Sequence, residues 1–167
     1  RNTPLLLTRA RPVRLRSSCQ KLNPKRHFRA EGGCLCGSVR ITASAPPSFS
    51  PAFCHCDNCR YFHGAPFAME AGFPLSSCQI TGETTSYFSS QNFERHRCAV
   101  CGTPCGGLHH GLQALFIPTT ILTPPGASAS PELSPTMHLF YSKRIIEDIF
   151  CDDGLPKHDR MPPLDST

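Results

Sequence analysis

The chain has 167 residues, of which 39% are hydrophobic and 17% charged, a balance that suits one packed domain and argues against a disordered chain. Seventeen prolines and twelve glycines disfavour long helices. No apolar run approaches the roughly 18 residues that a membrane span needs, so the sequence predicts no membrane partner.

The net charge of +5 is distributed unevenly along the chain. Residues 1–30 hold nine Lys and Arg and no acidic residue, whereas residues 31–167 hold eight Lys and Arg against twelve acidic residues. We therefore predict a basic arm over 1–30, a domain over 31–160 and a short tail over 161–167. The arm has the composition of a disordered tail, and also that of a mitochondrial transit peptide or a nucleic-acid-binding arm. The acidic domain has no evident phosphate-binding face, so nucleic acid is expected as a partner only through the arm.

The domain is expected to be mainly β, a small antiparallel structure with long loops. Residues 82–83 are Gly-Glu, which suits a two-residue type II′ hairpin between the strands on either side. Residues 45–51 are expected to form a proline-rich loop, and residues 152–167 a loop and tail. Alternating and apolar patterns predict strands over 38–42, 65–73, 78–81, 84–89, 92–97, 112–118 and 137–141.

Cysteine is the strongest signal in the composition, with eleven in the chain. An odd number is awkward for full disulfide pairing, and no secretory signal is evident at the start of the sequence. The spacings favour metal binding by thiolates over a secreted disulfide framework. Seven cysteines fall into three clusters, Cys34-Leu35-Cys36, Cys54-His55-Cys56-Asp57-Asn58-Cys59 and Cys98-Ala99-Val100-Cys101.

The number of clustered cysteine sulfurs predicts two zinc ions per chain. Structural zinc takes four protein ligands, and catalytic zinc keeps three and an open position. The first and third clusters together give four sulfurs, a closed site. The middle cluster gives three sulfurs, and spacing alone leaves open whether a fourth residue such as His55, Asp57 or Cys105 closes that site. We expect His55 to be a packing residue, because neighbouring residues of an extended chain point apart.

The ordered set of cysteine motifs resembles the glutathione-dependent formaldehyde-activating enzyme family, which shares its domain with centromere protein V. The segments that carry the resemblance are GGCLCGSVRIT, CHCDNCRYFHGAPFA, TGETTSYFSS, CAVCGTP and FCDDGLPKH, within residues 31–158. The resemblance implies a zinc-held β-tent fold. It also implies a closed zinc on Cys34, Cys36, Cys98 and Cys101, and an open, catalytic zinc on Cys54, Cys56 and Cys59.

The function that the resemblance implies is that of a carbon–sulfur lyase acting on glutathione or a related thiol adduct, as in the synthesis of S-hydroxymethylglutathione. Arg60 and His63 are candidate contacts for the carboxylates of a small-molecule thiol substrate. The alternative is a non-catalytic zinc scaffold that binds a partner. An intracellular location, most simply cytoplasmic, is expected, or a mitochondrial one if residues 1–30 are a transit peptide.

Overall fold

The computed structural model describes residues 27–150 and 152–162, so nearly all of the basic arm and most of the tail lie outside the described residues. The described part is mainly β with antiparallel sheets, which confirms the predicted fold class. Its elements are β1 (Ala30–Gly33), β2 (Arg40–Ala43), β3 (Phe49–Cys54), α1 (Asp57–His63), β4 (Ala68–Pro74), β5 (Cys78–Thr81), β6 (Thr84–Ser90), β7 (Phe93–Cys98), β8 (Pro104–His109), β9 (Ala114–Pro118), the 3₁₀ helices η1 (Thr119–Leu122), η2 (Pro131–Leu133) and η3 (Tyr141–Lys143), and β10 (Met137–Leu139) and β11 (Lys157–His158).

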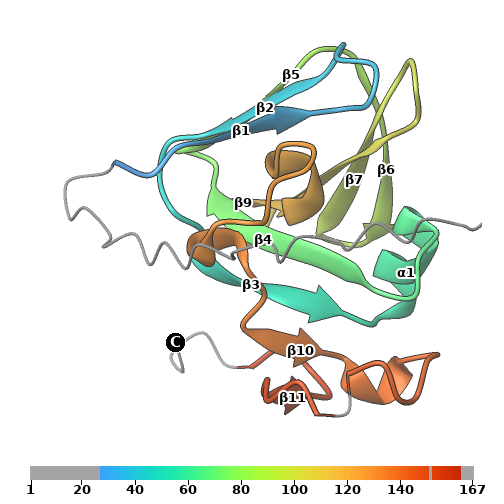
Figure 1. Ribbon diagram of the computed structural model, residues 1–167. Helices are drawn as coiled ribbons and strands as arrows, with labels where there is room; N and C mark the ends of the chain where they lie inside the picture. The colour runs from blue at the N-terminus through green and yellow to red at the C-terminus, as the bar shows by residue number, and fades with distance from the viewer. Residues whose placement is uncertain (1–26, 151, 163–167) are drawn as a thin grey trace, which may run out of the picture.

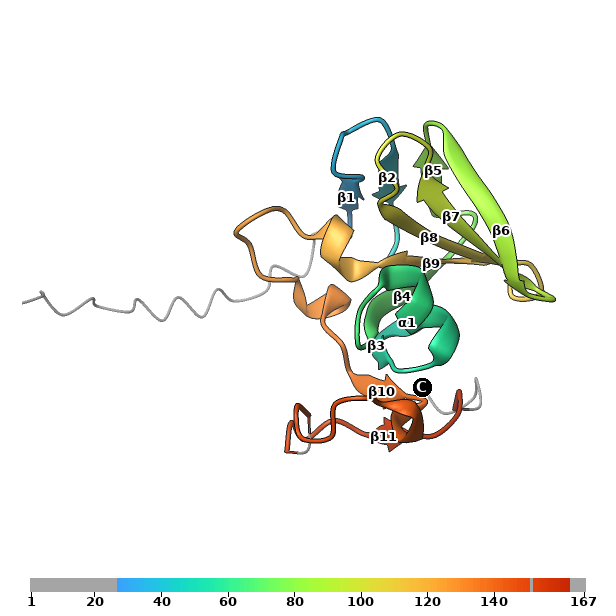
Figure 2. The same ribbon diagram turned by 90° about the vertical axis from the view of Figure 1, so that its right-hand side faces the viewer.

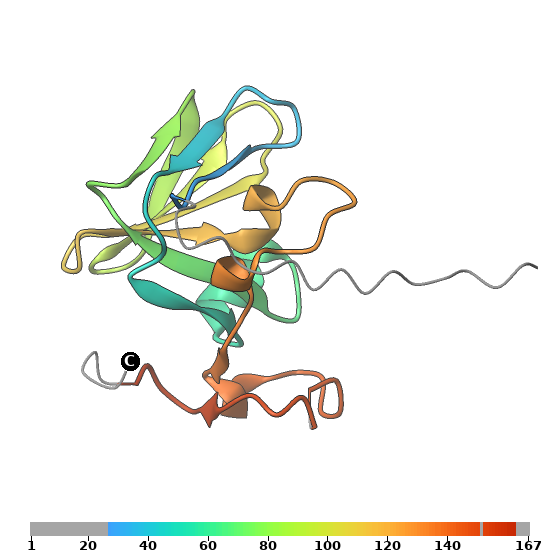
Figure 3. The ribbon, with the colours of Figure 1, turned by 60° about the vertical axis from the view of Figure 1, so that its left-hand side comes forward.

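The strands form two sheets. The small sheet has the order β1-β2-β5 and the large sheet the order β11-β10-β3-β4-β9-β8-β7-β6. Neighbouring strands are antiparallel except at β10, which runs parallel to both β3 and β11. Figures 1 and 2 place the small sheet at one end of the molecule and β10 with β11 at the other, and Figure 3 shows the same arrangement from a third side.

The hydrophobic core has two parts. The larger part lies between the sheets and contains Val39, Ile41, Phe73 and Ile117, all fully buried. Alternation in β2 produces this directly, because Ile41 and Ala43 face inward while Arg40 and Thr42 face solvent. The smaller part lies along β3, β4, α1 and β10, and it includes two of the clustered cysteines. One set of metal-binding candidates therefore lies in apolar surroundings.

The hairpin predicted at Gly82 is wrong. β5 pairs with β2 in the small sheet, and β6 pairs with β7 in the large sheet, so the two strands are neighbours in sequence only. Gly82 has a φ of +101°, and a Cβ there would lie 2.2 Å from the carbonyl oxygen of Ser38. Glycine is required here because the chain passes against another backbone segment as it crosses between sheets.

The predicted loop over 45–51 and the region after it contain elements that the sequence analysis missed. β3 already begins at Phe49, and Pro51 fits into it because the pairing with β4 is irregular between Phe49 and Ala52. Helix α1 has only seven residues, too few for a periodic signal. Gly64 ends it in the left-handed conformation and donates its backbone N–H to Arg60. No helix in the described ranges is both long enough and apolar enough to cross a bilayer.

Candidate metal centres

Four cysteines from two distant turns form the first sulfur group. The Sγ atoms of Cys34, Cys36, Cys98 and Cys101 all lie within 4.8 Å of one another. The first two come from the turn between β1 and β2, and the last two from the end of β7, so the group joins the two sheets. Four thiolates are a complete ligand set for tetrahedral zinc. We call these residues the four-sulfur group.

Hydrogen-bond donors favour the thiolate form of Cys34 and Cys101 in the four-sulfur group. The backbone N–H of Cys101 points at Cys98 Sγ at 3.4 Å, and that of Val39 donates to Cys34 Sγ at 3.2 Å. Burial raises the pKa of Cys34, but the Val39 amide and nearby hydrogen bonds outweigh it and bring the pKa to about 7. Hydrogen bonding to Thr103 lowers the pKa of Cys101 to about 5. The thiolate is the form that binds a metal.

Three cysteines around the start of α1 form the second group. Cys54 ends β3, Cys56 caps the N-terminus of α1, and Cys59 lies in the helix's first turn. Their Sγ atoms also lie within 4.8 Å of one another, and no further His, Cys, Asp or Glu among the described residues joins them at this distance. We call these residues the three-sulfur group.

The residues considered from sequence as a fourth ligand bond elsewhere. His55 Nε2 lies 2.9 Å from His138 Nδ1, which agrees with the expectation that His55 packs behind the site. Asp57 pairs with Lys143 across the surface. Cys105 is fully buried on β8, where its thiol donates to the Thr103 carbonyl, and burial raises its pKa to about 11.

The three-sulfur group favours a cation. Hydrogen bonds from Cys54 and Cys59 lower the pKa of Cys56 to about 2. The bond with Cys56 raises the pKa of Cys54 to about 12, and contacts with both neighbours and burial raise that of Cys59. Three sulfurs within 4.8 Å of one another repel as thiolates unless a cation lies among them. A zinc ion would allow all three to deprotonate, so this donor set fits zinc.

A buried ion pair supports the three-sulfur group. Arg95 on β7 is 3% exposed, and its Nη1 donates to Glu70 Oε1 at 3.1 Å while its Nη2 lies 3.3 Å from Cys59 Sγ. His63 Nε2 lies 3.0 Å from the same Glu70 oxygen, and the guanidinium carbon lies 4.3 Å from the centre of the Phe93 ring. Burial lowers the pKa of Arg95, but Glu70 and Cys59 outweigh it and raise the pKa overall. Arg95 thus places a fixed positive charge beside a sulfur of the three-sulfur group.

Neither Glu70 nor Arg95 was predicted from the sequence. The available signal was one acidic residue inside the apolar segment Ala68–Pro74, because a charge in a buried strand needs a partner. That partner lies in β7, which is separated from β4 by two strands in the large sheet, and local pattern does not reveal such a contact.

A second polar chain, buried at His55 and His138 and reaching the surface at Asp153, lies behind the Cys54–Cys56 loop. Asp153 Oδ2 lies 2.6 Å from His138 Nε2, and a carboxylate accepts, so His138 carries its proton on Nε2 and accepts from His55 at Nδ1. Burial lowers the pKa of His55 to about 4, which keeps the ring neutral. The backbone N–H of His55 also donates to the Leu139 carbonyl at 2.9 Å. Together these bonds hold the loop on β10.

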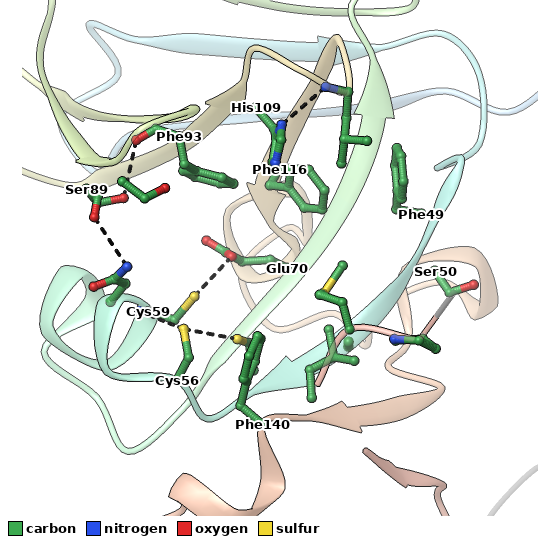
Figure 4. Close-up of a pocket in the computed structure, with 18 of the residues that line it drawn as sticks. Phe49, Ser50, Cys56, Cys59, Glu70, Ser89, Phe93, His109, Phe116 and Phe140 are labelled. Atoms are coloured by element: carbon green, nitrogen blue, oxygen red, sulfur yellow. Dashed lines mark hydrogen bonds between the residues drawn. The ribbon is translucent and has the colours of Figure 1, made fainter. Parts of the chain in front are cut away.

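The three-sulfur group opens onto a cavity of about 640 Å³. Figure 4 shows Cys56 and Cys59 at one side of this space and the rings of Phe49, Phe93 and Phe116 across from them. The lining residues are Ser48, Phe49, Ser50, Ala52, Cys54, Cys56, Asn58, Cys59, Glu70, Ser89, Ser90, Phe93, Arg95, His109, Leu112, Phe116, Met137, Leu139, Phe140, Met161 and Pro162.

Arg60 and His63, the predicted substrate contacts, do not line the cavity. Arg60 lies on α1 and bonds Asp57, one turn earlier. His63 lies one hydrogen bond behind the cavity wall, on Glu70. Their contact with substrate stays a prediction.

Comparison with known proteins identifies the family. A family model described as glutathione-dependent formaldehyde-activating enzyme matches residues 29–143. The chain belongs to this family. A crystal structure of a Rhodobacter sphaeroides protein is similar at 22% identity and a TM-score of 0.45, covering 59% of this chain and 90% of that one. No curated protein matches the chain. The region matched to the formaldehyde-activating family contains both sulfur groups, Glu70 and Arg95.

Proposed function

We propose that the chain is a zinc-dependent enzyme of the carbon–sulfur lyase type that makes and breaks adducts of a thiol with formaldehyde. The main support for this function is the difference between the two sulfur groups. The four-sulfur group is a complete zinc ligand set, whereas the three-sulfur group has one ligand fewer and lines a cavity large enough for a small molecule. Membership of the formaldehyde-activating family supports the same reaction class.

The reaction needs no oxidant or reductant. The thiol's S–H bond and the aldehyde's C=O π bond are exchanged for an S–C bond and an O–H bond, and the reverse reaction restores both. Zinc held by Cys54, Cys56 and Cys59 would supply a soft Lewis acid that prefers a thiol sulfur. The protein's own contribution is to hold the thiol in the cavity, beside the sulfur group and shielded from water.

Charge balance assigns a role to Arg95. Three thiolates exceed the charge of one zinc ion, and the Glu70 carboxylate adds another negative charge close by. The buried guanidinium contacts both Glu70 and Cys59, which offsets this excess where the substrate sulfur would bind. We propose Cys54, Cys56 and Cys59 as zinc ligands and Arg95 as the residue that keeps them deprotonated.

The test is the rate of formaldehyde exchange with glutathione, measured by exchange NMR because the adduct also forms without an enzyme. We expect the wild-type protein to accelerate exchange and Cys56→Ala to lose the acceleration, with zinc per chain falling from two to one by native mass spectrometry. Cys78→Ala is the matched control, because Cys78 is buried in the core and outside both sulfur groups. If the wild-type protein carries two zinc ions but does not accelerate the exchange of formaldehyde with any thiol, the protein is a scaffold instead.

A further inference from the structure

One histidine on the cavity wall has a hydrogen-bond donor whose direction is fixed. The backbone N–H of Leu112 donates to His109 Nδ1 at 3.2 Å, so Nδ1 is an acceptor and the ring carries its proton on Nε2. The ring centre lies 5.8 Å from that of Phe93, edge to face, and 6.5 Å from that of Phe116. A Cβ at Gly111 would lie 3.4 Å from His109 Cε1, so the backbone also packs against the ring. These contacts hold the ring in one orientation.

The Nε2–H of His109 is available to a ligand. No other described residue bonds it, and Nε2 is not one of the polar atoms sealed in the interior of the described part without a partner. His109 lines the cavity, and Figure 4 shows its ring beside Phe93 and Phe116, across the space from Cys56. The residue therefore offers a preset donor to a ligand whose other end lies at the three-sulfur group.

The polar side chains nearest the three-sulfur group bind one another. Asn58 Nδ2 donates to the Ser89 carbonyl at 3.3 Å, and Ser89 Oγ accepts from Arg95 Nε at 3.3 Å. Arg95 Nη2 in turn lies 3.3 Å from Cys59 Sγ. These groups form the end of the cavity where a thiol sulfur would bind, and His109 belongs to the opposite end. Further hydroxyl groups, which can rotate to suit a ligand, come from Ser48, Ser50 and Ser90.

The strand register gives the spacing between these two ends. Arg95 on β7 pairs with Gly107 on β8, and Phe93 pairs with His109. His109 therefore lies one two-residue step, about 7 Å, further along the same face of the sheet than Arg95. Glutathione is the tripeptide γ-Glu-Cys-Gly, and an extended peptide spans about 3.3–3.6 Å per residue, so its terminal carboxylates lie up to about 7 Å from the cysteine. The step along the sheet matches the length of such an arm.

We infer that His109 determines specificity for a glutathione-type thiol, by donating its Nε2–H to a carboxylate oxygen at the end of one arm while the thiol sulfur lies at the three-sulfur group. The inference rests on the proposed function and names the residue that recognises its substrate. His109 is assigned to binding and not to the addition of S–H across the C=O bond, because it lies at the end of the cavity away from the sulfurs.

The first experiment removes the donor and keeps an aromatic ring. Dissociation constants for the zinc-loaded full chain are measured by ligand-observed NMR with two probes, glutathione and 2-mercaptoethanol, which is a thiol without a carboxylate-bearing arm. We expect His109→Phe to weaken glutathione binding by about tenfold, because a hydrogen bond to a carboxylate is lost, and to leave 2-mercaptoethanol binding unchanged. Equal weakening of both thiols, or unchanged glutathione binding, would overturn the inference.

Two further variants separate loss of the donor from a general disturbance. His109→Gln should bind glutathione more tightly than His109→Phe, because the glutamine amide nitrogen can donate from the place of Nε2. His110→Phe is the matched control, because His110 is exposed, lies 3.1 Å from Glu94 and does not line the cavity. It should bind both thiols as the wild type does. No rescue by glutamine, or an equal loss in His110→Phe, would contradict the assignment.

Exchange rates distinguish this inference from the proposed function. In formaldehyde exchange with glutathione, His109→Phe should raise KM and leave kcat unchanged, as expected for a group that only binds the substrate. Accelerated exchange with an unchanged KM in His109→Phe would support the proposed function and overturn the role of His109. Glutathione binding that depends on His109, in a wild-type protein that does not accelerate exchange, would support the role of His109 and overturn the proposed function.

Discussion

Arg95 and Glu70 form an ion pair in which neither side chain reaches solvent freely. The pair takes two charges out of water, which is tolerable only because each keeps several partners. Removing one charge leaves the other buried without its main partner. Removing both charges leaves no unpaired charge in the interior. The cost of a single substitution should therefore exceed that of the double substitution.

We expect Arg95→Met to lower the free energy of unfolding by about 3–5 kcal/mol, the range for breaking a buried pair. Adding Glu70→Gln should recover part of that loss, since the uncompensated carboxylate is then gone. Urea denaturation of the two single variants and the double variant forms a double-mutant cycle that measures the coupling. A double variant less stable than Arg95→Met would contradict this account.

Phe140 has a φ of +54° and a ψ of +42°, a left-handed backbone conformation that a bulky residue rarely adopts. Its ring lies beside the three-sulfur group and packs on the smaller core, so packing there offsets the backbone strain. We expect Phe140→Gly to be about 1 kcal/mol more stable than Phe140→Ala, because glycine relieves the left-handed strain that alanine keeps. Thermal denaturation compares them, and the opposite order would show that the strain is negligible.

At the scale of elements, local spacing made the grouping of the clustered cysteines predictable. Cys54, Cys56 and Cys59 lie within six residues, so the chain itself brings them together, and the strand end and short helix only set their directions. The supporting residues come from β4, β7 and the segment after β10, and their contacts depend on strand order. The hairpin prediction at Gly82 was wrong for the same reason, because β5 and β6 belong to different sheets. The sequence pattern predicted the clustered cysteines but did not predict the residues that position them.

The segment between β10 and β11 stabilises the Cys54–Cys56 loop through Asp153. Hydrogen bonding from His138 holds the pKa of Asp153 well below its usual range near 3.9. A carboxyl group with a lowered folded-state pKa stabilises the protein above its unfolded pKa and loses that contribution as the pH falls through the folded-state pKa. We expect Asp153→Asn to be less stable than wild type at pH 7, with a difference that shrinks below about pH 4.

Urea denaturation of both proteins across this pH range measures the difference. Zinc content is measured at each pH, and stabilities are compared only where both proteins carry the same amount of zinc. A difference that stays constant from pH 7 to pH 3 would show that the carboxylate charge is not what stabilises the segment.

At the scale of the whole molecule, the four-sulfur group is the cross-link between the two sheets. It brings Cys36 next to Cys98, which are 62 positions apart, so a metal ion bound there would close a long loop of chain. By the loop-entropy argument used for disulfides, such closure stabilises by roughly 4 kcal/mol. By the same argument, the three-sulfur group closes a loop of only six residues and should stabilise the fold by about 2 kcal/mol.

We therefore expect Cys36→Ala to lower the free energy of unfolding in zinc-containing buffer by roughly 4 kcal/mol, and Cys56→Ala by clearly less. Each variant should carry one zinc ion by native mass spectrometry. Chemical denaturation ranks the two, with Cys78→Ala as the control for loss of a buried cysteine side chain. Equal destabilisation by Cys36→Ala and Cys56→Ala would mean that sheet-to-sheet cross-linking is not the main contribution.

The parallel pairing of β10 with β3 has a consequence for the order of events during synthesis. Residues 137–139 pair with residues 52–54, so the ribosome must make about 80 further residues before β10 exists. The sulfurs of Cys54, Cys56 and Cys59 are available to a metal long before then. A zinc ion that binds this group during synthesis would therefore reach it from open solvent, and Met137, Leu139 and Phe140 would close over it afterwards.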